Sequence, residues 1–88
     1  MKPYTEETLS DNKVIRKFSS KSDDHEFRWH RDDENRFIRI IKSNGWFFQF
    51  DNEIPFEMKE DGFFSIKKGQ WHRIIKGYDD LILSIIKE

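Results

Sequence analysis

Short runs of apolar and aromatic residues, separated by polar turn-forming stretches, recur along this chain and indicate short β-strands; in residues 25–31 polar and aromatic residues alternate. These runs cover residues 14–18, 25–31, 36–42, 46–51, 56–59, 63–67, 71–76 and 81–87. No apolar repeat of 3.6 residues is sustained anywhere, so the sequence predicts little or no helix. Residues 1–12 are polar around a single Leu9. We expect them either to be loosely ordered or to add an edge strand.

Turn-forming residues separate the runs at intervals of about 8 to 12 residues, the spacing of a small sandwich or barrel. One turn is Ser43-Asn44-Gly45. Its Asn-Gly pair favours the positive φ values of a tight hairpin, which predicts pairing between the runs 36–42 and 46–51. The pattern therefore predicts an all-β fold in a single domain over residues 1–88.

The composition supports this prediction, because large aromatic side chains must build the core of so short a chain. The 88 residues include nine Phe and three Trp, and Ala is absent. Aromatic and β-branched residues suit a pleated sheet better than a helix. The aromatic residues expected in the core are Trp46, Phe48, Phe50, Phe63, Phe64 and Trp71.

Charge and cysteine content exclude several classes of protein. The net charge is −1, whereas nucleic-acid-binding proteins usually have a basic excess. There is no cysteine, which removes disulfides and thiolate chemistry. No apolar run approaches the roughly 20 residues that span a bilayer, and the acidic start is unlike a signal peptide. We expect a cytoplasmic protein with no nucleic-acid or membrane partner.

The segment Trp29-His30-Arg31-Asp32 holds the clearest candidate chemistry. On a strand, His30 and Asp32 would face the same side, and His72 lies in another predicted strand. Two imidazoles and one carboxylate form the facial triad that suits Fe(II), and Zn(II), Mn(II) or Ni(II) accept similar ligands. The alternative is a hydrogen-bonded surface His30 beside an Asp32 that begins a turn. Spacing alone favours this alternative.

Residues 61–72 resemble the second sequence motif of the cupin superfamily, in which a turn, an apolar strand and a Gly turn precede a metal-binding histidine. Asp61-Gly62, Gly69 and His72 fill these places, although Lys67 stands where cupins usually have Pro. The first cupin motif has His-x-His followed by Glu. Here its three positions are occupied by His30, Asp32 and Arg36.

This resemblance extends over about residues 25–87 and implies a small RmlC-like jelly-roll β-barrel. It also implies one divalent metal ion held by His30, Asp32 and His72, with Fe(II) favoured. The segments 29–32, 46–49 and 71–77 are further similar to small cupin-like proteins of marine bacteria and their tailed phages. That group implies no particular reaction.

Two polar residues are candidates for contact with a substrate. Arg36 cannot bind a cation, so it would either neutralise Asp32 or clamp a substrate carboxylate or phosphate. Gln49 lies among aromatic residues; facing inward it would contact a ligand, and facing outward it is the polar half of a strand. His25 adjoins a polar loop, and we expect it to be exposed and not a ligand.

The sequence thus predicts a metal-binding cupin-like protein, and one hypothesis is an Fe(II)-type enzyme acting on a small polar or anionic molecule. A second is a non-catalytic ligand-binding or accessory module, including a phage protein. A third is a structural barrel without metal. The resemblance also implies a homodimer.

Overall fold

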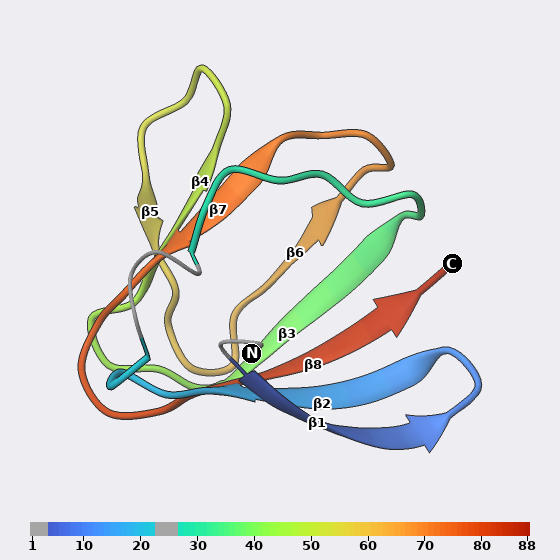
Figure 1. The fold of residues 1–88 in the computed structure, drawn as a ribbon, viewed down its shortest axis with the longest axis horizontal. Helices are drawn as coiled ribbons and strands as arrows, with labels where there is room; N and C mark the ends of the chain where they lie inside the picture. Colours follow the sequence, from blue (N-terminus) through green and yellow to red (C-terminus); the bar gives the residue numbers. More distant parts are fainter. Residues whose placement is uncertain (1–3, 23–26) are drawn as a thin grey trace.

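The computed structural model describes residues 4–22 and 27–88, which form β-strands joined by turns and loops, with no helix among them (Figure 1). The strands are β1 (Tyr4–Ser10), β2 (Lys13–Phe18), β3 (Arg36–Lys42), β4 (Phe47–Phe50), β5 (Phe56–Glu57), β6 (Phe63–Ile66), β7 (His72–Ile75) and β8 (Leu81–Lys87). The described residues accordingly offer no helix that could cross a membrane. The all-β prediction is confirmed.

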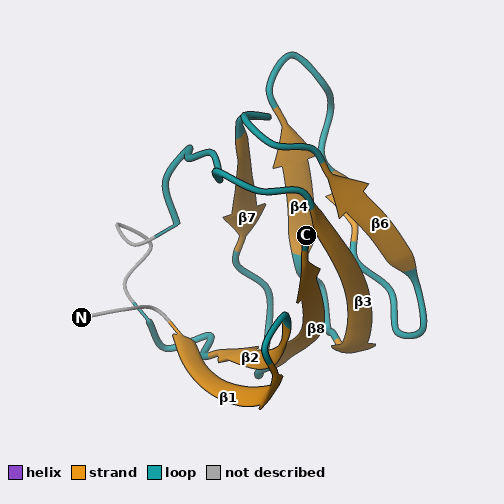
Figure 2. Ribbon diagram, turned by 90° about the vertical axis from the view of Figure 1, so that its right-hand side faces the viewer, coloured by secondary structure: helices purple, strands orange, loops and turns teal. Residues whose placement is uncertain are grey.

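The strands form two antiparallel sheets that face each other (Figure 2). The larger sheet has five strands in the order β1-β2-β8-β3-β6, and the smaller has three in the order β5-β4-β7. Strand β8 is the centre of the larger sheet and pairs with β2 on one side and β3 on the other. Strands adjacent in sequence therefore often lie in different sheets, as in a jelly roll.

Most predicted runs become strands. Strands β3 and β8 cover residues 36–42 and 81–87 as predicted, and the others differ by a few residues at their ends. The N-terminal segment is the edge strand β1, paired with β2 from Tyr4 opposite Phe18. Of the two alternatives for this segment, the edge strand is confirmed for residues 4–10.

The predicted strand over residues 25–31 is wrong for its described part. Residues 25 and 26 lie outside the described residues, and within 27–31 only His30 pairs, in one isolated bridge to His72. Strict alternation is lost, since Phe27 packs against the core whereas Trp29 is 39% exposed. The segment crosses from β2 to β3 and touches β7 at a single point, so it has no neighbour along which a ladder could continue.

The predicted hairpin at Asn44-Gly45 is also wrong, because β3 and β4 lie in different sheets. Gly45 does have a positive φ of 69°, but the turn serves to pass from one sheet to the other. There Gly77 packs directly on it, since a Cβ on Gly77 would lie 2.4 Å from the carbonyl carbon of Gly45. The Asn-Gly signal located the turn and left its partner strand undetermined.

The core between the sheets consists of aliphatic and aromatic side chains from both. Trp46 and Phe48 are buried, and Phe50 and Phe64 pack against them as predicted. Phe63 and Trp71 were expected in the core but are 69% and 42% exposed. Consecutive strand residues face opposite sides, so the inward Phe64 and His72 turn their preceding neighbours outward.

Candidate metal centre

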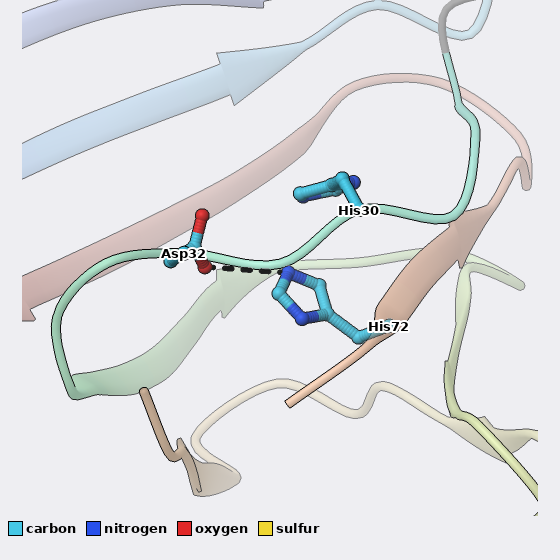
Figure 3. Close-up of side chains that lie close together, drawn as sticks. All are labelled: His30, Asp32 and His72. Carbon is cyan, nitrogen blue, oxygen red and sulfur yellow. Dashed lines mark ion pairs between the residues drawn. The ribbon is translucent and has the colours of Figure 1, made fainter. Parts of the chain in front are cut away.

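His30, Asp32 and His72 converge at one place between the sheets (Figure 3). One potential ligand atom from each lies within 4.8 Å of the other two. His72 is the first residue of β7, and two backbone hydrogen bonds of 3.0 and 2.9 Å join it to His30. The bridge therefore brings two histidines that are distant in sequence side by side, with ring centroids 4.3 Å apart.

Backbone carbonyls fix the tautomer of both rings. Nδ1 of His30 lies 2.9 Å from the carbonyl oxygen of Arg28, and Nδ1 of His72 lies 2.9 Å from that of Gln70. A carbonyl oxygen only accepts, so each Nδ1 must donate its proton. In the neutral ring the lone pair is then on Nε2, as in histidines whose outer nitrogen is hydrogen-bonded while the inner one binds a metal.

Asp32 completes the set with an oxygen that lacks a donor. Its Oδ2 is buried, has no hydrogen-bond partner, and lies 3.4 Å from His72 Nε2. Burial lowers the pKa of His72, which favours the neutral ring with its lone pair facing the carboxylate. Two lone-pair donors that face each other, one on His72 and one on the buried Asp32 oxygen, fit a cation between them. The three residues thus fit a divalent metal ion in both geometry and donor type.

Arg36 holds the same carboxylate from its other oxygen. It begins β3, and its Nη2 lies 3.4 Å from both Asp32 Oδ1 and Glu34 Oε1. Its Nε is buried with no hydrogen-bond partner. Arg36 therefore contacts Asp32, as the sequence suggested, and leaves Oδ2 to face the two imidazoles.

The site opens into a cavity of about 510 Å³ between the two sheets. Its walls are largely apolar, and the lining residues are Tyr4, Arg16, Phe18, Phe27, His30, Asp32, Arg36, Ile38, Phe48, Ile66, His72, Ile74, Leu83 and Ile85. A volume of several hundred Å³ is in the range of small-molecule sites. The candidate metal centre lies within this lining.

Arg16 and Tyr4 line the cavity and were not predicted to do so from the sequence. Arg16 is only 8% exposed, forms an ion pair of 2.6 Å with Glu6, and lies 3.9 Å from the centre of the Tyr4 ring. A signal for Arg16 was present, because it alternates with Val14 and Phe18, both buried, and so shares their inward face.

Gln49 does not line the cavity. Its Nε2 donates to the carbonyl oxygen of Glu53, and its Oε1 accepts from Nε of Arg73. The structure thus places Gln49 in a network with β7 and the 50–53 turn, while Arg36 lies beside the candidate ligands. His25, expected to be exposed, lies outside the described residues.

The two histidines stand in identical tripeptides, Trp29-His30-Arg31 and Trp71-His72-Arg73. In the antiparallel bridge each Trp faces the Arg of the other tripeptide. Arg73 lies 4.9 Å from the Trp29 ring centre, and Arg31 lies 5.1 Å from that of Trp71. Two cation–π pairs therefore flank the histidine pair. The repeated Trp-His-Arg tripeptide is the sequence signal for this pairing.

No protein-family model and no curated protein matches the chain. Among solved structures, it is similar to the DMSP lyase DddQ from Ruegeria pomeroyi, with a TM-score of 0.79 and 9% identity over 98% of this chain. It is also similar to a cupin-2 domain protein from Shewanella frigidimarina, with a TM-score of 0.67 and 14% identity over 97% of this chain and 79% of the other. The fold is that of a cupin.

The share of each chain that is covered, and a third similar structure, limit what these similarities show. The chain spans 47% of the length of DddQ. It matches a structure of FeII HppE with a TM-score of 0.66 and 9% identity, over 86% of this chain and 41% of the other. At such identities the cupin fold is shared, and function has to be argued from the site itself.

Proposed function

We propose that this cupin barrel binds one divalent metal ion through Nε2 of His30, Oδ2 of Asp32 and Nε2 of His72. The observation that supports it is the meeting of two imidazole lone pairs with a buried carboxylate oxygen that has no hydrogen-bond partner. Fe(II) is the favoured ion, since this ligand set is that of the facial triad, and Zn, Mn and Ni accept it as well.

We further propose that the protein acts on a small polar or anionic molecule in the adjoining cavity. A bound metal ion would supply Lewis acidity and open coordination positions. The protein's own residues would fix the imidazole tautomers, orient Asp32 through Arg36, and exclude water with apolar walls. Solved cupin folds similar to this one include a DMSP lyase and an FeII protein, which supports a metal-dependent enzyme.

A non-catalytic ligand-binding module is the second candidate function, and one observation favours it. The titratable residues that line the cavity are the three proposed ligands, Tyr4, and two arginines already paired with carboxylates. Among the described lining residues, no further carboxylate or imidazole is left to act as a general base.

The decisive measurement is metal content of the protein purified without chelators or a histidine tag. We expect about one divalent ion per chain in the wild type, and loss of most of it in Asp32→Asn and His72→Ala. Asp61→Asn is the matched control. The Asp61 side chain is 88% exposed, pairs with Arg39 and is not part of the candidate ligand group. Full occupancy in Asp32→Asn would contradict the ligand assignment.

Oxygen consumption by the Fe(II)-loaded protein with small organic acids separates the enzyme from the binding module.

We also propose that the protein is a cytoplasmic homodimer. The outward Phe37, Ile41 and Phe63 are 40%, 44% and 69% exposed, and they would supply an apolar face for a second copy. Light scattering gives the mass, and a monomer at all concentrations would contradict the dimer.

A further inference from the structure

The cavity extends well beyond the candidate metal centre, and its size limits what can fill it. Its volume is about 510 Å³, whereas one water molecule occupies about 30 Å³ of liquid. Aliphatic and aromatic side chains from both sheets make up most of the lining. An inorganic ion would leave most of this apolar surface uncovered, so the space suits an organic molecule with an apolar body.

The charged side chains around the cavity indicate the sign of the charge that a ligand would carry. Two guanidiniums, of Arg16 and Arg36, face three carboxylates, those of Asp32, Glu6 and Glu34. These five side chains sum to a net charge of −1, and histidines that ligate a metal ion do so as neutral imidazoles. A divalent cation would change that to +1. One uncompensated positive charge in an apolar enclosure favours a ligand with a single negative charge.

The two arginines differ in the donors that they have left. Arg16 uses Nε and Nη2 on one oxygen of Glu6, and its guanidinium stacks on Tyr4. Arg36 uses only Nη2, which it shares between Asp32 and Glu34. Its Nε has no hydrogen-bond partner, and none of its contacts among the described residues involves Nη1. Arg36 thus has a buried Nε without a partner, whereas Nε of Arg16 is bonded to Glu6, and Arg36 also lies beside the candidate ligand Asp32.

We propose that the cavity takes a small organic monoanion with an apolar body, and that the Arg36 guanidinium donates hydrogen bonds to its anionic group. This proposal rests on the proposed metal-binding function, because without the cation the net charge around the cavity is negative. Arg36 would then have two tasks, with Nη2 holding Asp32 and its remaining donors facing the ligand. A charge-assisted pair of this kind is directional as well as strong.

The test has two steps, so that the two proposals can fail separately. Calorimetric titration with Mn²⁺ first measures metal binding. The Mn²⁺-saturated protein is then titrated with benzoate and hexanoate, and with benzamide and inorganic phosphate for comparison. We expect the two carboxylates to bind, and benzamide and phosphate to bind at least about tenfold more weakly, since only the carboxylates combine charge with an apolar body.

Variants locate the anionic group. At saturating Mn²⁺, Arg36→Gln should weaken benzoate binding about tenfold or more, and Arg36→Lys should restore part of it. Arg39→Gln is the matched control, since this arginine is on the same strand but its side chain is 64% exposed. It should bind benzoate as the wild type does.

Failure of Mn²⁺ to bind would overturn the proposed metal-binding function and this proposal with it. Mn²⁺ binding without carboxylate binding would overturn this proposal alone, as would equal affinity for benzamide, tighter binding of phosphate, or unchanged benzoate affinity in Arg36→Gln.

Discussion

The two Trp-His-Arg tripeptides have the same sequence and the same local hydrogen bonding but very different surroundings. Trp71 precedes β7, whose first residue is His72, and the tripeptide Trp71-His72-Arg73 places His72 in the interior, where it is 2% exposed. Trp29-His30-Arg31 is in neither sheet, and His30 is exposed and lines the cavity. In each, Nδ1 is bonded to the carbonyl oxygen two residues earlier.

The difference in burial between His72 and His30 means that metal binding and fold stability can be tested separately at these two residues. The antiparallel bridge and the two carbonyl contacts set where each Nε2 lies, and these are nearly the same for both histidines. Burial differs, since His72 also stacks on Phe48 at 5.3 Å with an interplanar angle of 16°. We therefore expect both histidines to matter for metal binding and only one to matter much for folding.

Alanine at each histidine tests this separation with the largest expected effect. In metal-free protein, His72→Ala should lower the free energy of unfolding by about 2–4 kcal/mol, because it empties a packed interior site. His30→Ala should change it by about 0.5 kcal/mol or less, as for an exposed residue. Urea denaturation in the presence of a chelator measures both.

Metal affinity should respond differently. Each alanine variant removes one proposed ligand, so both should lose more than the 10- to 100-fold that removal of an outer-shell partner typically costs. Calorimetric titration with Mn²⁺ checks this, with Asp61→Asn as the unaffected control. Equal destabilisation of the apo protein by the two alanines would contradict the comparison, and so would wild-type Mn²⁺ affinity in His30→Ala.

The cation–π pairs offer a second and smaller test. Arg73 covers Trp29 and also donates to Gln49, so it ties the irregular His30 segment to β4 and β7. Arg73→Ala should cost about 0.5–1 kcal/mol of stability and weaken Mn²⁺ binding several-fold, because the His30 segment loses a support. Arg31→Ala, which removes only the pair with Trp71, should have a smaller effect on stability.

Mn²⁺ titration and urea denaturation of the two arginine variants show whether Arg73 positions His30 for metal binding or only stabilises the fold. Arg73→Lys keeps the charge and should recover part of the affinity. If Arg73→Ala lost stability and kept full Mn²⁺ affinity, the pair would support the fold alone.

Much of the fold followed from local pattern. Apolar runs bounded by turn-forming residues placed β3 and β8 at their full lengths. Which strands pair with each other depends on residues far apart in the sequence. The local Asn44-Gly45 signal therefore predicted a hairpin, although β3 and β4 lie in different sheets. The segment 25–31 alternates like a strand, yet it has one bridge partner, and periodicity carries no information about available neighbours.

For the candidate site, the sequence supplied the donor types, and the structure supplied the distances. Spacing alone favoured a hydrogen-bonded surface His30, and the resemblance to cupin motifs selected His30, Asp32 and His72, which do lie together. Arg16 was overlooked although its alternation with Val14 pointed inward. Gln49 was ambiguous, because a polar residue between aromatics fits either face until the strand's partner, here β7, is known.

The pKa of His72 gives the finest test of the buried half of the site. Burial lowers it from the usual value of 6.5, so the unfolded chain takes up a proton at a higher pH than the folded protein does. Unfolding therefore binds a proton in the window just below about pH 6.5. The stability of metal-free protein should fall as the pH decreases through this window and should not depend on His72 above it.

Urea denaturation of metal-free wild type and His72→Gln across this range measures the effect, because the difference between them removes the contribution of the other titrating groups. The wild type should lose stability relative to His72→Gln as the pH falls. The opposite slope would mean that Asp32 holds His72 as an imidazolium, with a proton in the gap between Nε2 and Oδ2. That gap would then be filled by an ion pair of the protein itself, and the case for a bound cation there would lose its main support.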